Sequence, residues 1–372
     1  MDKDKLYEKS KKIQLDRIGA SCFFDAISCS LEFVDKLYWA LEYTQYKFLY
    51  NRESFLSFEN DYDLEKLLSK SDRYYFYKDP VSTYRNAISK YDISLLERRV
   101  KKMICFEEIE NTFFFETIKA LRDNKLPAVL VVNTLAYKEF YEMHNFTVPR
   151  SDCKHKINIL GVSEDGKRAF IFDRGFDCFG EWIDIEKLYK GATSPFLDKN
   201  GFFSLFYFKP GLPPELEHAE IYELFKDNLE NCFRKQIIID DIEYMNNGNA
   251  LLAFKHDLKD IIFSLESKYG NFAAALMGEA LVQQVDGAMG LVGLYREMNN
   301  FFYSPHLNCL LPTFRHYWEV WKRFESRLQY ITYNEKELHN YCSTLEKTVD
   351  FLIEDDKIIM DGVSKIVNFL TK

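Results

Sequence analysis

The sequence lacks the features that mark secreted, membrane and nucleic-acid-binding proteins. Its first residues, MDKDKLYEKSKK, are charged and are followed by no apolar run, so they do not resemble a secretory signal. No stretch approaches the roughly 18 consecutive apolar residues that a membrane helix needs. The formal net charge is −9, whereas nucleic-acid binding requires concentrated positive charge. We therefore expect a cytoplasmic protein with neither a membrane nor a nucleic acid as its partner.

Paired cysteines are also missing. Eight cysteines are scattered along the chain without a CxxC pair, which favours reduced thiols in a reducing compartment. Most of them should be small buried hydrophobic residues. Cys153, Cys178, His144 and His155 match no structural zinc spacing, so we expect no metal and no bound cofactor.

What the sequence does contain is a change of pattern along its 372 residues, a length that favours two domains. Helical and strand patterns alternate up to about residue 208. The segment KPGLPPE then interrupts the chain with three prolines, and long helical patterns follow it. We predict an α+β domain over residues 1–212 and a mainly helical domain over residues 213–372.

The first domain should consist of a central helix packed on an antiparallel sheet. Apolar residues recur every three or four positions from Cys22 to about residue 41, and Ser21 is a suitable N-cap. A second helical pattern covers residues 107–124. Short apolar or alternating runs predict strands at 128–134, 155–162, 168–173, 181–184 and 202–208.

Cys22 is the candidate nucleophile because it opens the predicted central helix. The positive end of the helix dipole favours the thiolate, which is the reactive form of cysteine. The small residues just before it leave room for a substrate carbonyl. The backbone N–H of Cys22 can form half of an oxyanion hole, with Gln14 as a candidate for the other half. Gln14 also fits an ordinary surface amide, and Cys22 taken alone also fits a packing role.

A predicted hairpin supplies the base. His155 begins one strand and Asp173 ends the next, and an Asp-Gly turn joins them near residue 165. This register places His155 opposite residue 173 or 174, within reach of a hydrogen bond that would orient the imidazole. Asp177 or Asp184 replaces Asp173 if the register differs. The alternative is that His155 merely opens a strand and Asp173 merely ends one.

These residues carry a family resemblance that covers roughly residues 14 to 208. GASCFFDAISCSLEF resembles the nucleophile segment of the butirosin biosynthesis protein H family, in its papain-like N-terminal domain. LPAVLVVNTLAY and HKINILGVSEDGKRAFIFD resemble the later half of that domain, and a helical domain usually follows it. The chain departs from the family in Gly19-Ala20-Ser21 before the nucleophile and in VVNT after the first strand.

The resemblance implies a papain-like cysteine acyltransferase of specialised metabolism, which moves an acyl group from the phosphopantetheine thioester of a carrier protein to an amine. The chain is similar, too, to the cysteine-protease-like amide synthases of the closthioamide type. Cys22, His155 and Asp173 would form the catalytic triad. Carrier proteins are usually acidic, so a basic docking segment is expected in LERRVKK, at Arg98, Arg99, Lys101 and Lys102. That segment also fits a solvated helix face.

Two other functions use the same residues differently. A papain-like peptidase or thioesterase would resolve the acyl-enzyme with water instead of an amine. A non-catalytic binding protein would keep the fold but hold Cys22 and His155 apart.

Overall fold

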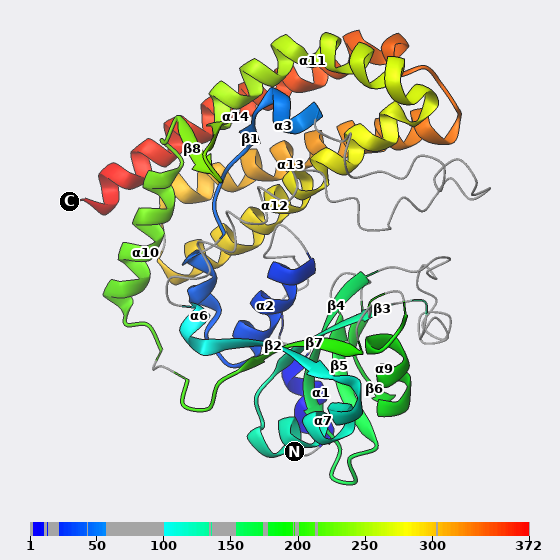
Figure 1. Ribbon diagram of the computed structural model, residues 1–372. Coiled ribbons are helices and arrows are strands. Elements are labelled where there is room, and N and C mark those ends of the chain that lie inside the picture. Colours follow the sequence, from blue (N-terminus) through cyan, green and yellow to red (C-terminus); the bar gives the residue numbers. More distant parts are fainter. Residues whose placement is uncertain are drawn as a thin grey trace. The chain divides into compact units, whose positions relative to one another are not determined.

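The computed structural model describes residues 3–10, 13, 22–42, 44–56, 100–133, 135, 154–173, 178–195, 197, 201–212, 215–302 and 304–371. The described residues divide into two compact units, whose elements are labelled in Figure 1. The first unit contains those up to residue 42 and those from 100 to 217. The second contains residues 44–56 and 218–371.

The first unit is built on a six-stranded antiparallel sheet with the strand order β2-β7-β3-β4-β5-β6. Its elements are, in chain order, α1 (Lys3–Ser10), α2 (Cys22–Phe33), η1 (Leu37–Glu42), α6 (Val100–Met103), β2 (Ile104–Glu110), η3 (Asn111–Phe113), α7 (Phe114–Asn124), β3 (Ala128–Asn133), β4 (Lys154–Val162), β5 (Arg168–Asp173), β6 (Cys178–Asp184), α9 (Ile185–Ala192) and β7 (Phe202–Phe208).

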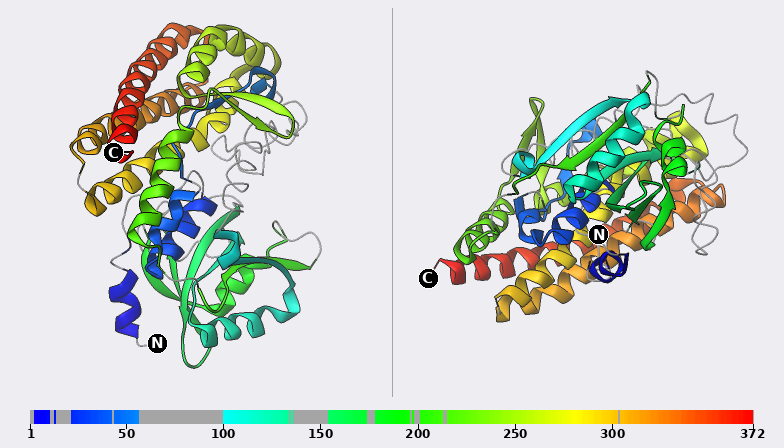
Figure 2. Two further views of the ribbon diagram at one scale, coloured as in Figure 1. Left: turned by 90° about the vertical axis from the view of Figure 1, so that its left-hand side faces the viewer. Right: turned by 90° about the horizontal axis from the view of Figure 1, so that it is seen from below.

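Helices cover both faces of this sheet. Leu130, Ile157 and Ile171 lie on the face that packs against α7 and α9. Phe170 and Phe172 lie on the opposite face, in a cluster with side chains of α1 and α2. Figure 2, left, shows α1 and α2 on one side of the sheet and α7 on the other. Because neither face of its centre is open to water, all six residues of β3 are buried.

Two elements differ from the sequence prediction. The central helix ends at Phe33 instead of near residue 41, because Asp35 takes a left-handed conformation with φ 59°. The backbone N–H of Lys36 then bonds the carbonyl of Leu31 at 2.7 Å, a Schellman-type end. The predicted helix over 107–124 is also wrong in its first part, since residues 104–110 form β2 and the helix starts at Phe114.

The second unit consists mainly of long helices and a small antiparallel sheet with the order β1-β9-β8. Helices α11 to α14 pack beside one another (Figures 1 and 2). Its elements are β1 (Leu49–Tyr50), α3 (Arg52–Leu56), α10 (His218–Asn231), β8 (Gln236–Ile239), β9 (Ile242–Asn246), α11 (Asn247–Tyr269), η6 (Gly270–Phe272), α12 (Ala273–Phe301), α13 (Pro305–Tyr333), η7 (Leu338–Tyr341) and α14 (Cys342–Leu370).

The division of the chain differs from the predicted boundary at residue 212 because residues 44–56 belong to the helical unit. Tyr46, Phe48 and Tyr50 alternate along this segment, and all three are buried there. The Phe48 ring lies 5.2 Å from that of Trp321 on α13. The backbone N–H of Phe48 also donates to Oδ1 of Asn247 at 2.9 Å. These contacts fix the segment in the helical core, and the second crossing between the units follows residue 217.

The structure therefore has the predicted α+β character, with an antiparallel sheet, a helix packed against it and a mainly helical second unit. In the part of the chain that it describes, no helix combines the length and the apolar composition needed to span a bilayer.

Candidate functional site

His155 and Asp173 form a buried pair at one end of the six-stranded sheet. Nε2 of His155 lies 2.9 Å from Oδ1 and 3.0 Å from Oδ2 of Asp173. The two residues are 7% and 3% exposed. A hydrogen bond so shielded from water is electrostatically stronger than one at the surface. The contact predicted from the hairpin is thus present.

The register that produces this contact is not the predicted one. Asn158 pairs with Phe172, and the pairing shifts between Ile159 and Gly161, where β4 contains a bulge. Continued from Asn158 and Phe172, the pairing places Asp173 opposite Ile157, so Asp173 is a diagonal neighbour of His155 instead of a residue directly opposite. Diagonal neighbours on one face remain within reach of long side chains.

The pair determines which nitrogen of the imidazole can act as a base. An ionised carboxylate only accepts hydrogen bonds. Opposite such a carboxylate, Nε2 carries the ring proton and donates a hydrogen bond to Asp173. Nδ1 is then the nitrogen that can take a proton from a reacting group. Asp173 also stabilises the imidazolium that forms when Nδ1 is protonated.

Helix α2 begins at Cys22, as predicted. The side chain of Cys22 lies outside the described residues. Further along the helix, the Ser30 hydroxyl donates to Oδ1 of Asn158 on β4 at 2.6 Å, and both residues are fully buried. This bond joins the helix of the candidate nucleophile to the strand of the candidate base.

Strand alternation places the His155 side chain and helix α2 on opposite faces of the sheet. Asn158 faces α2, so His155 faces the other side of the sheet with Ile157. The two faces meet at the end of the sheet. There Asn133, which alternation places on the α2 side, donates from Nδ2 to the hydroxyl of Ser194 at 2.9 Å. Because Ser194 follows α9 on the opposite side, side chains of the two faces can meet around this end.

Sequence reasoning missed these supporting residues. Asn133 and Ser194 are polar and buried, at 3% and 8% exposure, and both lie near the end of the sheet that holds the His–Asp pair. The polar Asn133 at the end of an otherwise apolar strand was the available signal. Ser30 and Asn158 gave no comparable signal, since each is a single polar residue inside an amphipathic pattern.

The remaining candidates lie outside the described residues or away from the pair. Asp184 pairs with Arg168, with 3.3 Å between Oδ1 and Nε, and both side chains are more than half exposed. Lys101 and Lys102 belong to α6, but their side chains are not described. The other predicted positions outside the described residues are Gln14, Arg98, Arg99, His144, Cys153 and Asp177, together with the side chain of Cys178.

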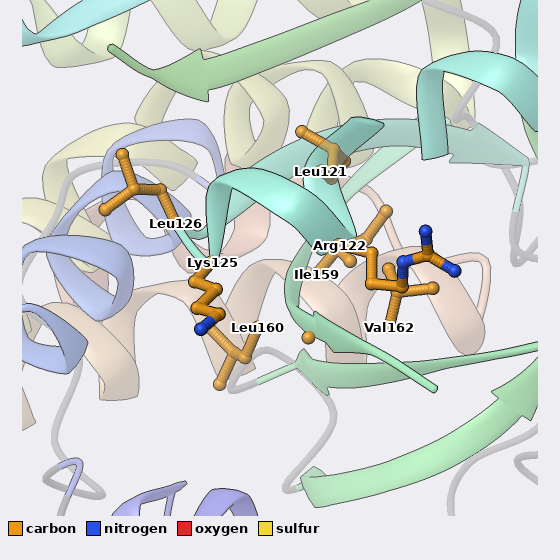
Figure 3. Close-up of a pocket in the computed structure, with 8 residues that line it drawn as sticks. Leu121, Arg122, Lys125, Leu126, Ile159, Leu160 and Val162 are labelled. Atoms are coloured by element: carbon orange, nitrogen blue, oxygen red, sulfur yellow. The ribbon is translucent and has the colours of Figure 1, made fainter. Parts of the chain in front are cut away.

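A small hollow lies on the first unit beside the bulge of β4, between Leu160 and the end of α7 (Figure 3). It has room for about one water molecule, so it is no substrate site. Arg122, at its rim, donates to the backbone carbonyl of Glu164 at 3.1 Å and thereby ties α7 to the hairpin turn. Among the described residues, no group of three or more His, Cys, Asp or Glu side chains is arranged to hold a metal ion.

No protein-family model and no curated protein matches this chain.

Proposed function

We propose that this chain is a cysteine acyltransferase that takes an acyl group from a carrier-protein thioester and forms an amide with a small amine. The proposal includes a papain-like arrangement of the first unit and a triad of Cys22, His155 and Asp173. The observation that carries it is the buried His155–Asp173 pair at the end of a sheet against which the helix beginning at Cys22 packs.

In the first half of the reaction, the Cys22 thiolate attacks the thioester carbonyl. The carbon–sulfur bond to the phosphopantetheine arm breaks, and the leaving thiolate takes a proton from Nδ1 of the His155 imidazolium. The product is an acyl group on Cys22. The backbone N–H of Cys22, and Gln14 as its proposed partner, would stabilise the oxyanion.

In the second half, the amine attacks the acyl-Cys22 carbonyl. Nδ1 of His155 removes a proton from the nitrogen, and the Cys22 thiolate leaves as the amide forms. Asp173 keeps the imidazole in the tautomer with its proton on Nε2 throughout. No cofactor is required, because the acyl group arrives already activated as a thioester.

The proposal requires the Cys22 thiol to meet Nδ1 of His155 around the end of the sheet. The Asn133–Ser194 bond supports this, since it already joins side chains from the two faces at that end. A bifunctional thiol- and imidazole-reactive cross-linker with a short arm should join Cys22 to His155 in the wild type. Cys29 is buried further along α2. An adduct on Cys29 alone would show that the reagent enters the protein without joining Cys22 to His155, and it would therefore argue against their contact.

Acyl or peptidyl carrier proteins are the proposed donors, with Arg98, Arg99, Lys101 and Lys102 as the docking segment. Charge reversal at these four positions should weaken binding of an acidic carrier and reduce its dependence on salt. Unchanged binding would assign them to an ordinary solvated surface.

Intact mass spectrometry with acyl-carrier thioesters tests the function directly. We expect an acyl adduct on Cys22 that amines discharge faster than water does, and no adduct in Cys22→Ala. Faster discharge by water would identify a hydrolase. Amide formation by Cys22→Ala at the wild-type rate would refute the triad, and the absence of any adduct on the wild type would favour a binding protein.

A further inference from the structure

Three phenylalanine rings form a row that starts in the first turn of α2 and ends at the surface. The Phe23 ring lies 4.7 Å from that of Phe206 on β7, and the Phe206 ring lies 4.7 Å from that of Phe106 on β2. Phe23 and Phe206 are half-buried, and Phe106 is 54% exposed. We call these three residues the phenylalanine row.

The row lies on the α2 face of the sheet. Phe106 pairs directly with Phe206 across β2 and β7, and Phe206 pairs in turn with Val129 of β3. Phe23 reaches this row from the helix, one residue after Cys22. The row therefore extends from the residue next to the proposed nucleophile to the edge strand of the sheet.

Folding alone does not explain the exposed end of this row. An exposed ring leaves apolar surface in water, and contiguous apolar surface beside a reactive group often marks a ligand site. The planes of neighbouring rings are inclined to one another by 53° and 37°, so the rings are tilted and not stacked face to face. An acyl chain lying along them would cover the exposed surface.

A charged residue beside the phenylalanine row limits which acyl groups can bind there. Glu108 lies two residues from Phe106 on β2, hence on the same face, and it is exposed. Its carboxylate would repel an acyl chain that ends in a second carboxylate. An uncharged chain would meet no such repulsion.

We infer that the phenylalanine row binds the acyl group of the donor thioester and selects uncharged apolar acyl groups, of medium-chain alkyl or aryl type, over short or acidic ones. This inference rests on the proposed function, because it assumes that the acyl group is transferred to Cys22.

Single-turnover acylation tests the selectivity. Acetyl, octanoyl and suberyl thioesters of N-acetylcysteamine serve as donors, and the adduct is followed by intact mass. The wild type should react about tenfold or more faster with octanoyl than with acetyl, as expected for a site that recognises several methylenes. Phe106→Ala and Phe206→Leu should each reduce this ratio by about tenfold. Phe113→Ala, which removes an exposed ring at the other end of β2, is the matched control and should keep the wild-type ratio.

The Glu108→Gln variant tests whether the charge beside the row affects selectivity. This variant should accept suberyl several-fold better relative to octanoyl than the wild type does, and the gain should fade at high salt. The inference would be overturned if Phe106→Ala and Phe206→Leu kept the full ratio of the octanoyl rate to the acetyl rate. Equal rates for all donors in the wild type would overturn it too.

A binding measurement separates this inference from the proposed function. The octyl thioether of N-acetylcysteamine cannot acylate Cys22, and its binding to Cys22→Ala is measured by calorimetry with and without Phe206→Leu. Binding that weakens about tenfold, with a negative heat-capacity change, supports the row even if no thioester ever acylates the enzyme. Acylation without any dependence on the row refutes the inference and leaves the acyltransferase intact. Failure of both measurements refutes both.

Discussion

Replacing Asp356 with asparagine should remove a pH dependence of stability from the helical unit. Asp356 lies on α14 and is 4% exposed. The hydroxyl of Tyr46 donates to its Oδ1 at 2.5 Å. A Cβ atom on Gly248 of α11 would lie 2.5 Å from Oδ2, so backbone closes the site on that side. Tyr317 of α13 and the Cys232 thiol also face the carboxyl, and both are buried.

Burial raises the pKa of Asp356 from 3.8 to about 6, and the hydrogen bond from Tyr46 opposes part of this rise. A raised pKa means that the folded state holds the proton more tightly than the unfolded state does. Stability is therefore highest below pH 4 for this group and falls as the pH rises through 6. At about 1.36 kcal/mol per unit of pKa, the loss amounts to about 3 kcal/mol and is complete by about pH 7.

Urea unfolding of the full chain, followed by far-ultraviolet circular dichroism between pH 4 and 7, measures this effect. In the Asp356→Asn variant the side chain at this position stays neutral at every pH. The difference in free energy of unfolding, variant minus wild type, should therefore increase by about 3 kcal/mol from pH 4 to pH 7. The neighbouring Asp355, whose pKa is also raised by burial, is unchanged in both proteins and cancels. Hydrogen exchange in α14 assigns the change to the helical unit.

Two further variants make the result specific. Asp361→Asn alters an exposed carboxylate of the same helix that pairs with Lys365, so it should change stability by at most about 1 kcal/mol. Tyr46→Phe removes the hydrogen bond that lowers the pKa of Asp356, so the midpoint of the pH dependence should move upward. A difference between wild type and Asp356→Asn that stays flat from pH 4 to 7 would refute the reasoning.

Three other predictions concern the site and the helix packing. Asp173→Asn should lower the acylation rate by about a hundredfold or more while leaving the fold intact, because it no longer stabilises the charged His155; a wild-type acylation rate in this variant would contradict this. Ser30→Ala should cost about 1–3 kcal/mol in urea unfolding by leaving a buried amide oxygen of β4 without its donor, and a neutral result would show that water replaces the hydroxyl. Gly362→Ala should destabilise the helical unit by about 1–3 kcal/mol despite alanine's better helix propensity, since the new Cβ would meet the Leu310 side chain; an increase in melting temperature would contradict this.

The sequence by itself determined the elements whose signals are local. The apolar run of β3, the alternation of β4 and β5 and the Asp-Gly turn between them needed only neighbouring residues, and their boundaries agree with the structure to within a residue. The same hairpin brought His155 and Asp173 together. The start of α2 at Cys22 followed from amphipathic spacing and a suitable cap.

The tertiary structure alone decided the features that depend on distant partners. Residues 104–110 carry a pattern compatible with a helix, but pairing with β7 makes them a strand. Leu49 and Tyr50 form a strand only because Asn246 and Met245 complete it, almost two hundred residues later. The bulge in β4 sets the diagonal contact of the His–Asp pair, and it lies in a strand that has a neighbouring strand on each edge and helices on each face. Local propensity is worth a few tenths of a kcal/mol per residue, and long-range burial overrides it wherever the two compete.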